Sequence, residues 1–255
     1  TASKIIDLND GRLALPIYGI PSGGIYDVAA LIYSSDSGAT WGSEKIIAGT
    51  GSDSANWTES DVHYLADGTT LLALIRRAGD PTGLATYRAT STNNGETWSA
   101  ATDTGISTTG AYTPWVQFGD GSIIAGIRTG LAEKIALSID NGVSFGDPIT
   151  LSDEGQGNYG AFAPISSNTA LFAFAACYGN TNPDRSDVWL AAISVGATAN
   201  KHGMFGPGAW LASVRAAILS PGLLPGLGFV PYSDAPSGTL QPSRLSASPI
   251  FCDRS

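Results

Sequence analysis

Short apolar stretches alternate with turn-forming residues along most of the chain. The segments at 12–20 and 69–75 are typical: each is a run of apolar and β-branched residues that begins directly after an Asp-Gly pair. Runs of this length, bounded by Gly, Asp, Asn and Ser, are the pattern of β-strands, and no stretch sustains the 3.6-residue periodicity of a helix. The pattern therefore predicts an all-β fold.

An eight-residue motif occurs three times and reads Ser-x-Asp/Asn-x-Gly-x-Thr/Ser-Trp/Phe. The copies are Ser34–Trp41, Ser91–Trp98 and Ser138–Phe145; their shared positions are Asp36, Gly38 and Trp41, then Asn93, Gly95 and Trp98, then Asp140, Gly142 and Phe145. Asp or Asn caps a turn with its own side chain, and Gly supplies a positive φ. We interpret each octad as a structural hairpin turn whose aromatic residue packs back beneath it.

The octads and the Asp-Gly pairs recur with a regular spacing. Successive octads begin 57 and then 47 residues apart, and an Asp-Gly pair precedes each one, at Asp10, Asp67 and Asp120. A period of this size fits a four-stranded antiparallel blade. The sequence therefore predicts a β-propeller with about four to five blades.

Four blades can be placed along the chain. The predicted strands are 4–8, 12–20, 27–34 and 45–48 for the first blade; 61–65, 70–76, 84–91 and the stretch after Trp98 for the second; 115–118, 123–128, 134–138 and 148–151 for the third; 161–165, 170–178 and 188–194 for the fourth. Residues 1–195 are thus predicted to hold the blades. Residues 196–255 are richer in Gly and Pro, and three interpretations stay open for them: ring closure, a last blade, or an extension.

Composition and charge narrow the classes of function. The chain has 255 residues, which suits one all-β domain, and a net charge of −9, which disfavours nucleic-acid binding. No apolar run approaches the roughly 20 residues of a membrane span, and no signal peptide is recognisable. Cys177 and Cys252 either form a disulfide or stay free, and His63 and His202 are too few for a histidine-rich metal site. We expect no metal and no cofactor.

The octads resemble the Asp-boxes, or BNR repeats, of the sialidase superfamily. The segments DGRLALPIYG at 10–19 and TESDVHYLADGTTLLALIRRAG at 58–79 are similar to its sialidase-like members. The resemblance implies a β-propeller, and because typical sialidases have six blades, it implies a reduced or partial ring here. Asp-boxes also occur in propellers without catalytic activity.

The resemblance also implies a set of site residues. Sialidases hold the sugar carboxylate with three arginines, because a guanidinium matches a carboxylate bidentately. Their nucleophile is a neutral tyrosine, which the substrate carboxylate does not repel, and a glutamate acts as its base. An aspartate is the acid/base. Glu59, eight residues before Asp67, corresponds to the glutamate, and Arg76 or Arg77 on the following strand corresponds to an arginine. Since neighbouring strand residues face opposite ways, only one of that pair faces the site.

Three further positions correspond more loosely. Arg128 ends the equivalent strand of the next repeat, Tyr159 follows the third octad where the family places Tyr-Ser, and Asp27 precedes the first octad near the position of the acid/base. Tyr112 precedes a different strand and is excluded as the nucleophile. Gly160 replaces the family serine, and the first strand, Ser3-Lys4-Ile5-Ile6, lacks the family's first arginine. The arginine clamp is therefore incomplete.

Two interpretations from different classes follow. The first is a sialidase-like glycoside hydrolase that acts on an acidic sugar. The second is a non-catalytic glycan-binding or structural propeller of a virion appendage, such as a viral tail protein, or of a cell-surface assembly. This interpretation predicts a homo-oligomer or a larger assembly. It leaves open whether tryptophans such as Trp57, Trp115 and Trp210 stack on sugars or pack between blades. Both interpretations predict an extracellular or surface-exposed protein.

Overall fold

The structure, a computed structural model, consists of β-strands. It describes residues 4–79, 85–109, 112–130, 132–152, 160–176, 187–197 and 212–219, with the backbone alone at 175–176, 187, 196–197 and 212–219. The strands in these ranges form four antiparallel sheets of four strands each. None of the described segments is a helix that could cross a membrane.

Each sheet is one propeller blade, and its strands follow in chain order. Blade 1 contains β1 (Ile6–Asp7), β2 (Leu13–Gly19), β3 (Val28–Ser34) and β4 (Gly42–Ala48); blade 2 contains β5 (Asn56–Tyr64), β6 (Leu71–Ala78), β7 (Ala85–Ser91) and β8 (Thr102–Ser107). Blade 3 contains β9 (Trp115–Gln117), β10 (Ile123–Thr129), β11 (Ala132–Ser138) and β12 (Ile149–Ser152); blade 4 contains β13 (Ala161–Ser166), β14 (Thr169–Ala176), β15 (Asp187–Ala197) and β16 (Ala212–Leu219). The predicted all-β propeller is confirmed.

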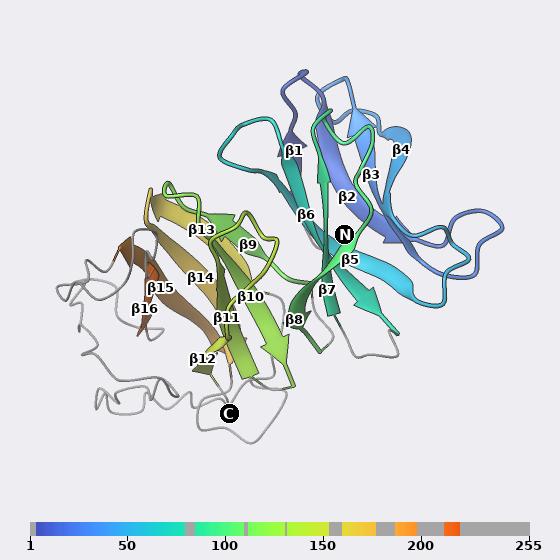
Figure 1. Cartoon of the computed structure of the whole chain (residues 1–255). Helices are drawn as coiled ribbons and strands as arrows, with labels where there is room; N and C mark the ends of the chain where they lie inside the picture. The colour runs from blue at the N-terminus through green and yellow to red at the C-terminus, as the bar shows by residue number, and fades with distance from the viewer. Residues whose placement is uncertain are drawn as a thin grey trace, which may run out of the picture.

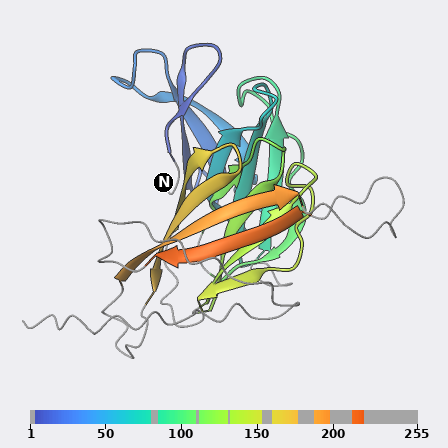
Figure 2. The same ribbon diagram turned by 90° about the vertical axis from the view of Figure 1, so that its left-hand side faces the viewer.

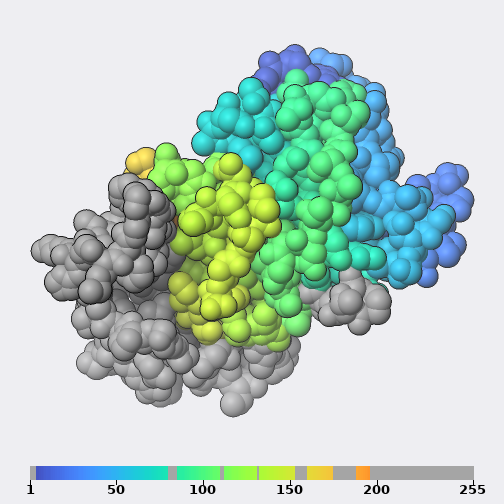
Figure 3. Space-filling view, in the orientation of Figure 1, coloured from blue at the N-terminus to red at the C-terminus, as the bar shows by residue number. Residues whose placement is uncertain are grey.

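The blades succeed one another in space as they do in the chain (Figure 1). Figure 3 shows the blue surface of blade 1 against the green of blade 2, which in turn meets the yellow-green of blade 3. Strands β15 and β16 form the outer pair of blade 4 (Figure 2). The first and last blades also touch, because Lys4 donates a hydrogen bond from Nζ to the carbonyl oxygen of Phe162, at 3.2 Å.

Apolar side chains fill the spaces between successive blades. One cluster joins blades 1 and 2 and includes Leu31 and Ile75, a second joins blades 2 and 3 around Ile123, and a third joins blades 3 and 4 around Ile135 and Phe172. All five of these side chains are at most 1% exposed. In the two middle blades the second strands, β6 and β10, are buried on both faces along most of their length, which is why they read as near-continuous apolar runs in the sequence.

The three octads form the same turn between the third and fourth strands of their blades. In the first, Ser34 donates from Oγ to Asp36 Oδ1 at 2.7 Å and accepts from the amide of Gly38 at 2.8 Å, while the amide of Thr40 donates to Asp36 Oδ1 at 2.8 Å. The indole Nε1 of Trp41 donates to the carbonyl oxygen of Gly38 at 3.0 Å, so the aromatic side chain closes the turn. The hydrogen bonds from Thr40 and Ser34 lower the pKa of Asp36 to about 2.

The octad glycine has two reasons to be glycine. Gly95 has φ of +80°, which side chains rarely tolerate. An added Cβ would also lie 2.6 Å from the hydroxyl of Tyr33 and 2.7 Å from Cδ1 of Leu31, both in blade 1. The octad of blade 2 is therefore both a turn and a part of the contact between blades.

One strand begins earlier than expected, and another lies in the segment for which three interpretations stay open. Strand β5 begins at Asn56, five residues before the predicted start, because the polar residues at its beginning are buried and paired with β6. Strand β16 lies within 196–255 and pairs with β15 as the outermost strand of blade 4. Cys177, His202, Trp210 and Cys252 lie outside the described residues.

Candidate functional site

Topology divides the connections between two ends of the propeller. In an antiparallel blade, the Asp-Gly turns and the octads lie at one end, and the connections from second to third strand and from blade to blade lie at the other. We call the latter the loop end. Glu59 near the start of β5, Arg76 near the end of β6, and Arg128 near the end of β10 all lie there, as does Asp27 just before β3.

A β-bulge brings Glu59 and Arg76 together. Trp57 pairs with Arg77 and Ser60 with Ile75, so two residues of β5 oppose Arg76 alone on β6. Bulges of this kind redirect a side chain and are frequent beside functional sites. The Nη1 of Arg76 donates to Oε2 of Glu59 at 2.5 Å.

This ion pair is largely shielded from water. The side chain of Glu59 is 5% exposed and that of Arg76 is 19% exposed. Removing one partner of such a pair leaves a buried charge and typically costs about 3–5 kcal/mol. The Nε–H of Arg76 is buried and has no hydrogen-bond partner among the residues that the structure describes. The ion pair thus holds both side chains in place, while the Nε–H of Arg76 donates no hydrogen bond to the described residues.

A second polar network holds β5 further along the strand, towards its C-terminal end. Asp61 accepts a hydrogen bond from the backbone amide of Trp115 at 3.0 Å and lies 3.0 Å from Nε2 of His63. The indole of Trp115 donates to the carbonyl oxygen of Asp61 and packs edge-on against His63. Trp115 is 3% exposed, so this tryptophan packs between blades. His63 belongs to the same packing contact.

Arg77 faces away from Glu59, as strand alternation predicts for one member of the pair. Its Nη1 donates to the hydroxyl of Tyr87 at 2.9 Å, and its guanidinium lies 5.1 Å from the ring of Trp57 and 5.2 Å from that of Tyr87. Trp57 and Tyr87 pack edge to face. Arg77 therefore packs on two rings of its own blade that belong to the apolar cluster between blades 1 and 2, and Arg76 is the arginine beside Glu59.

Arg128 lies on the next blade and faces a buried acid. It pairs across the β10–β11 hairpin with Glu133, and its Nε donates to the carbonyl oxygen of Gly130 at 3.4 Å. Glu133 is 2% exposed. Burial raises the pKa of Glu133 to about 8, and the nearby charge of Arg128 offsets part of that rise. The sequence pattern did not single out Glu133, although Arg128 and Glu133 stand two residues before and three residues after Gly130.

Of the other predicted residues, Asp27 is described and Tyr159 lies outside the described residues. Asp27 is held through its backbone beside the start of β5, since its amide donates to Oδ1 of Asn56 at 2.9 Å and its carbonyl oxygen accepts from the amide of Trp57 at 3.0 Å. Gly160, directly after Tyr159, packs so closely on Phe172 that an added Cβ would lie 2.5 Å from the ring. That contact leaves no room for a side chain at residue 160, where the resemblance to sialidases implies a serine.

Tyr112, which the sequence excludes as nucleophile, anchors this same segment. It is 8% exposed, and its hydroxyl donates to the carbonyl oxygen of Gly160 at 2.5 Å. Because the hydrogen bond reaches from the start of blade 3 to the start of blade 4, it fixes the backbone next to Tyr159. Tyr112 is therefore a positioning residue that spacing alone does not reveal.

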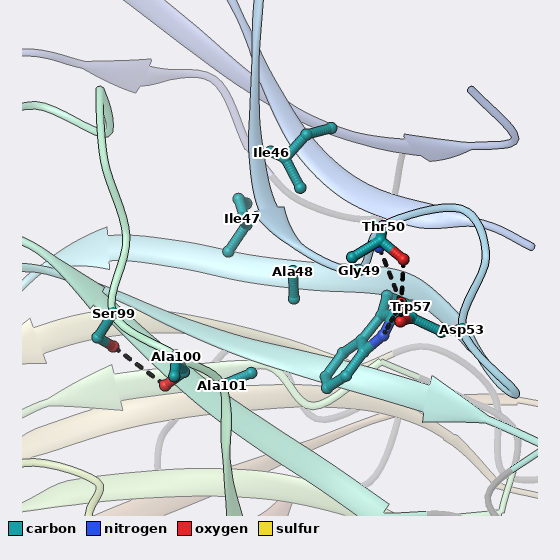
Figure 4. Close-up of a pocket in the computed structure, with 10 residues that line it drawn as sticks. All are labelled: Ile46, Ile47, Ala48, Gly49, Thr50, Asp53, Trp57, Ser99, Ala100 and Ala101. Atoms are coloured by element: carbon teal, nitrogen blue, oxygen red, sulfur yellow. Dashed lines mark hydrogen bonds between the residues drawn. The ribbon is translucent and has the colours of Figure 1, made fainter. Parts of the chain in front are cut away.

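A separate groove of about 280 Å³ lies between the outer parts of blades 1 and 2. It is lined by β4, by residues 99–101, by Thr50 and Asp53, and by Trp57, and Figure 4 shows Asp53 beside Thr50 and Trp57 at one side of it. Asp53 accepts hydrogen bonds from the amide of Thr50 at 2.8 Å and from the indole of Trp57 at 3.1 Å. Trp57 is 9% exposed and offers little ring surface. Within the described ranges, no group of three or more His, Cys, Asp or Glu side chains is arranged to hold a metal ion.

A comparison with protein families decides where the chain belongs. The sequence model of the BNR repeat-like domain matches residues 2–172, about two thirds of the chain. The chain belongs to the BNR repeat-like domain family. A search of curated proteins found no match for this BNR protein.

Solved structures support the same fold. A protein of unknown function from Dyadobacter fermentans is 17% identical, with a TM-score of 0.59 over 74% of this chain and 51% of its own. The leech intramolecular trans-sialidase is 19% identical (TM-score 0.53, 75% of this chain, 29% of its own), and the intramolecular trans-sialidase of Ruminococcus gnavus is 16% identical (TM-score 0.52, 75% and 41%). The BNR chain thus spans about half or less of these proteins, and identities this low establish the fold alone.

Proposed function

We propose that this BNR protein is a sialidase-like, carbohydrate-active propeller that takes an acidic sugar at its loop end. The observation that carries the proposal is the buried ion pair of Glu59 and Arg76, held at a bulge where strand ends converge. The ion pair fixes the position of a carboxylate that can accept a proton, and a guanidinium is the side chain that best matches a sugar carboxylate. The fold shared with two intramolecular trans-sialidases supports this assignment.

In the proposed mechanism, Arg76 and Arg128 hold the carboxylate of the sugar. Glu59 takes the proton of the Tyr159 hydroxyl as its oxygen bonds to the anomeric carbon, and Asp27 protonates the leaving glycosidic oxygen as that bond breaks. Water, deprotonated by Asp27, then releases the sugar from Tyr159, which recovers its proton from Glu59. These roles come from the resemblance to sialidases, and the protein acts on glycans outside the cell or on a surface.

The test is turnover of a fluorogenic sialoside, 4-methylumbelliferyl N-acetylneuraminide, by the full chain. We expect Tyr159→Phe to lose turnover and to retain binding of N-acetylneuraminic acid, because the phenyl ring fills the same space without a nucleophile. Tyr64 ends β5 beside the Asp-Gly turn, away from the loop end, so Tyr64→Phe provides the matched control and keeps the wild-type rate. Glu59→Gln tests the base and is compared at equal folded fraction, since it also breaks the ion pair.

The outcomes separate the two functional classes. Release of methylumbelliferone by the wild type with an unchanged rate in Tyr159→Phe would remove Tyr159 from the mechanism. Binding of N-acetylneuraminic acid without any release would favour the non-catalytic glycan-binding propeller. The absence of both binding and release, in a protein that circular dichroism shows to be folded, would reject the proposal.

A further inference from the structure

The β10–β11 hairpin carries a buried acid that the proposed mechanism does not use. Glu133 is the second residue of β11 and is paired with Arg128 on β10 and with Ser152 on β12. Its side chain is almost fully buried, at 2% exposure. Its Oε1 is buried and has no hydrogen-bond partner in the part of the chain that the structure describes. Buried carboxylate oxygens in native proteins are rarely left without a partner, so the position needs an explanation.

Among the described residues around Glu133, the charged group is Arg128. Glu133 and Ile135 lie on the same face of β11, because alternate strand residues share a face. Ile135 packs in the cluster between blades 3 and 4, to which blade 4 contributes apolar side chains such as Phe174. On β12 the facing residue is the neutral Ser152, so within the described ranges the charged group that faces Glu133 is Arg128 on β10.

The ionisation of Glu133 decides the net charge of this hairpin. Burial favours the neutral form of a carboxyl, and it raises the pKa of Glu133 to about 8. With Glu133 neutral, Arg128 keeps an uncompensated positive charge, and no carboxylate forms an ion pair with it among the described residues. With Glu133 ionised, its negative charge offsets the positive charge of Arg128, so Arg128 attracts an incoming anion more weakly.

We propose that Glu133 controls which ligands Arg128 accepts: its protonated form leaves Arg128 free to bind the carboxylate of an acidic sugar, and its ionised form competes with that carboxylate. The inference rests on the proposed function, since it concerns the same acidic sugar. It makes binding of the anion thermodynamically linked to uptake of one proton by Glu133. A neutral sugar gains nothing from this arrangement, so Glu133 also favours anionic over neutral ligands below its pKa.

The experiment is isothermal titration calorimetry of N-acetylneuraminic acid with the full chain between pH 6 and pH 9.5. Each pH is measured in two buffers of different ionisation enthalpy, which reports the protons taken up. We expect the wild type to take up close to one proton above pH 8 and to lose about tenfold in affinity for each further pH unit. Glu133→Gln removes both effects, because the amide cannot ionise. Glu44→Gln, on the exposed part of β4, keeps the wild-type pattern and is the matched control.

Failure of the inference and failure of the proposed function give different results. Binding with the same pH profile in the wild type and in Glu133→Gln would overturn the inference and leave the proposed function standing. Absence of binding by the folded wild type at every pH would overturn both. A second readout needs no substitution at Glu133: carboxyl-carbon NMR of the unliganded protein should show one Glu that titrates above pH 7 and titrates still higher in Arg128→Gln. If every Glu carboxyl titrates below pH 6, the inference is wrong.

Discussion

Replacing Glu133 by Gln should stabilise the protein, and by an amount that depends on pH. Glutamine has nearly the same shape as protonated glutamic acid but never ionises. A carboxyl whose pKa rises from 4.5 to about 8 on folding opposes folding whenever the pH exceeds the lower value. The free energy of unfolding of the wild type is therefore not reduced by Glu133 below pH 4.5, and it falls as the pH rises from 4.5 to about 8.

The size of the effect follows from that rise in pKa. One pKa unit corresponds to about 1.4 kcal/mol, so full ionisation of Glu133 costs at most about 5 kcal/mol. Water entry and side-chain relaxation reduce such penalties in real proteins. We therefore expect Glu133→Gln to raise the free energy of unfolding by about 2–4 kcal/mol at pH 9 and to leave it nearly unchanged at pH 4.5.

The assay is urea denaturation followed by tryptophan fluorescence, at intervals from pH 4.5 to pH 9. The difference in free energy of unfolding between Glu133→Gln and the wild type should grow with pH and level off above about pH 8. The same substitution at the exposed Glu44 should give a small difference that does not change with pH. Parallel curves for Glu133→Gln and the wild type over the whole range would refute the reasoning, because they would mean that Glu133 ionises equally in the folded and the unfolded chain.

Three further predictions concern the turns and the contacts between blades. Gly95→Ala should lower the free energy of unfolding by about 2–4 kcal/mol, because it combines a strained φ with two close contacts. Gly68→Ala, with φ of +68° and open space around it, should lower it by about 1 kcal/mol. Equal losses in urea denaturation would show that the contacts of residue 95 contribute nothing. Tyr112→Phe should cost about 1–2 kcal/mol by leaving the carbonyl oxygen of Gly160 without its donor, and sialoside turnover should fall with it; unchanged thermal stability would argue against the anchor. Hydrogen bonds from backbone amides lower the pKa of Asp67 to about 2, so its stabilising contribution is present above pH 4 and is lost as the pH falls towards 2. Asp67→Asn should therefore make the free energy of unfolding depend less on pH between 4 and 2. The same pH dependence in the variant and the wild type would contradict this prediction.

The sequence by itself determined the repeating part of this protein. The octads and the Asp-Gly pairs are local, since each closes its own turn through hydrogen bonds such as that from the amide of Gly38 to Ser34, and turns of this kind depend on only a few neighbouring residues. Their spacing then fixed the length of a blade, and strand alternation predicted that Arg76 and Arg77 face opposite ways. These properties were therefore readable without a structure.

The candidate site depended on contacts between residues that are distant in the chain. A bulge in β5 placed Glu59 on Arg76, the hydroxyl of Tyr112 reached the segment after Tyr159, and packing between blades 3 and 4 buried Glu133. None of these follows from local propensity, because each depends on which strand or blade lies opposite. Burial and the distance to the nearest opposite charge set the ionisation of a carboxyl, and only the tertiary structure decides both.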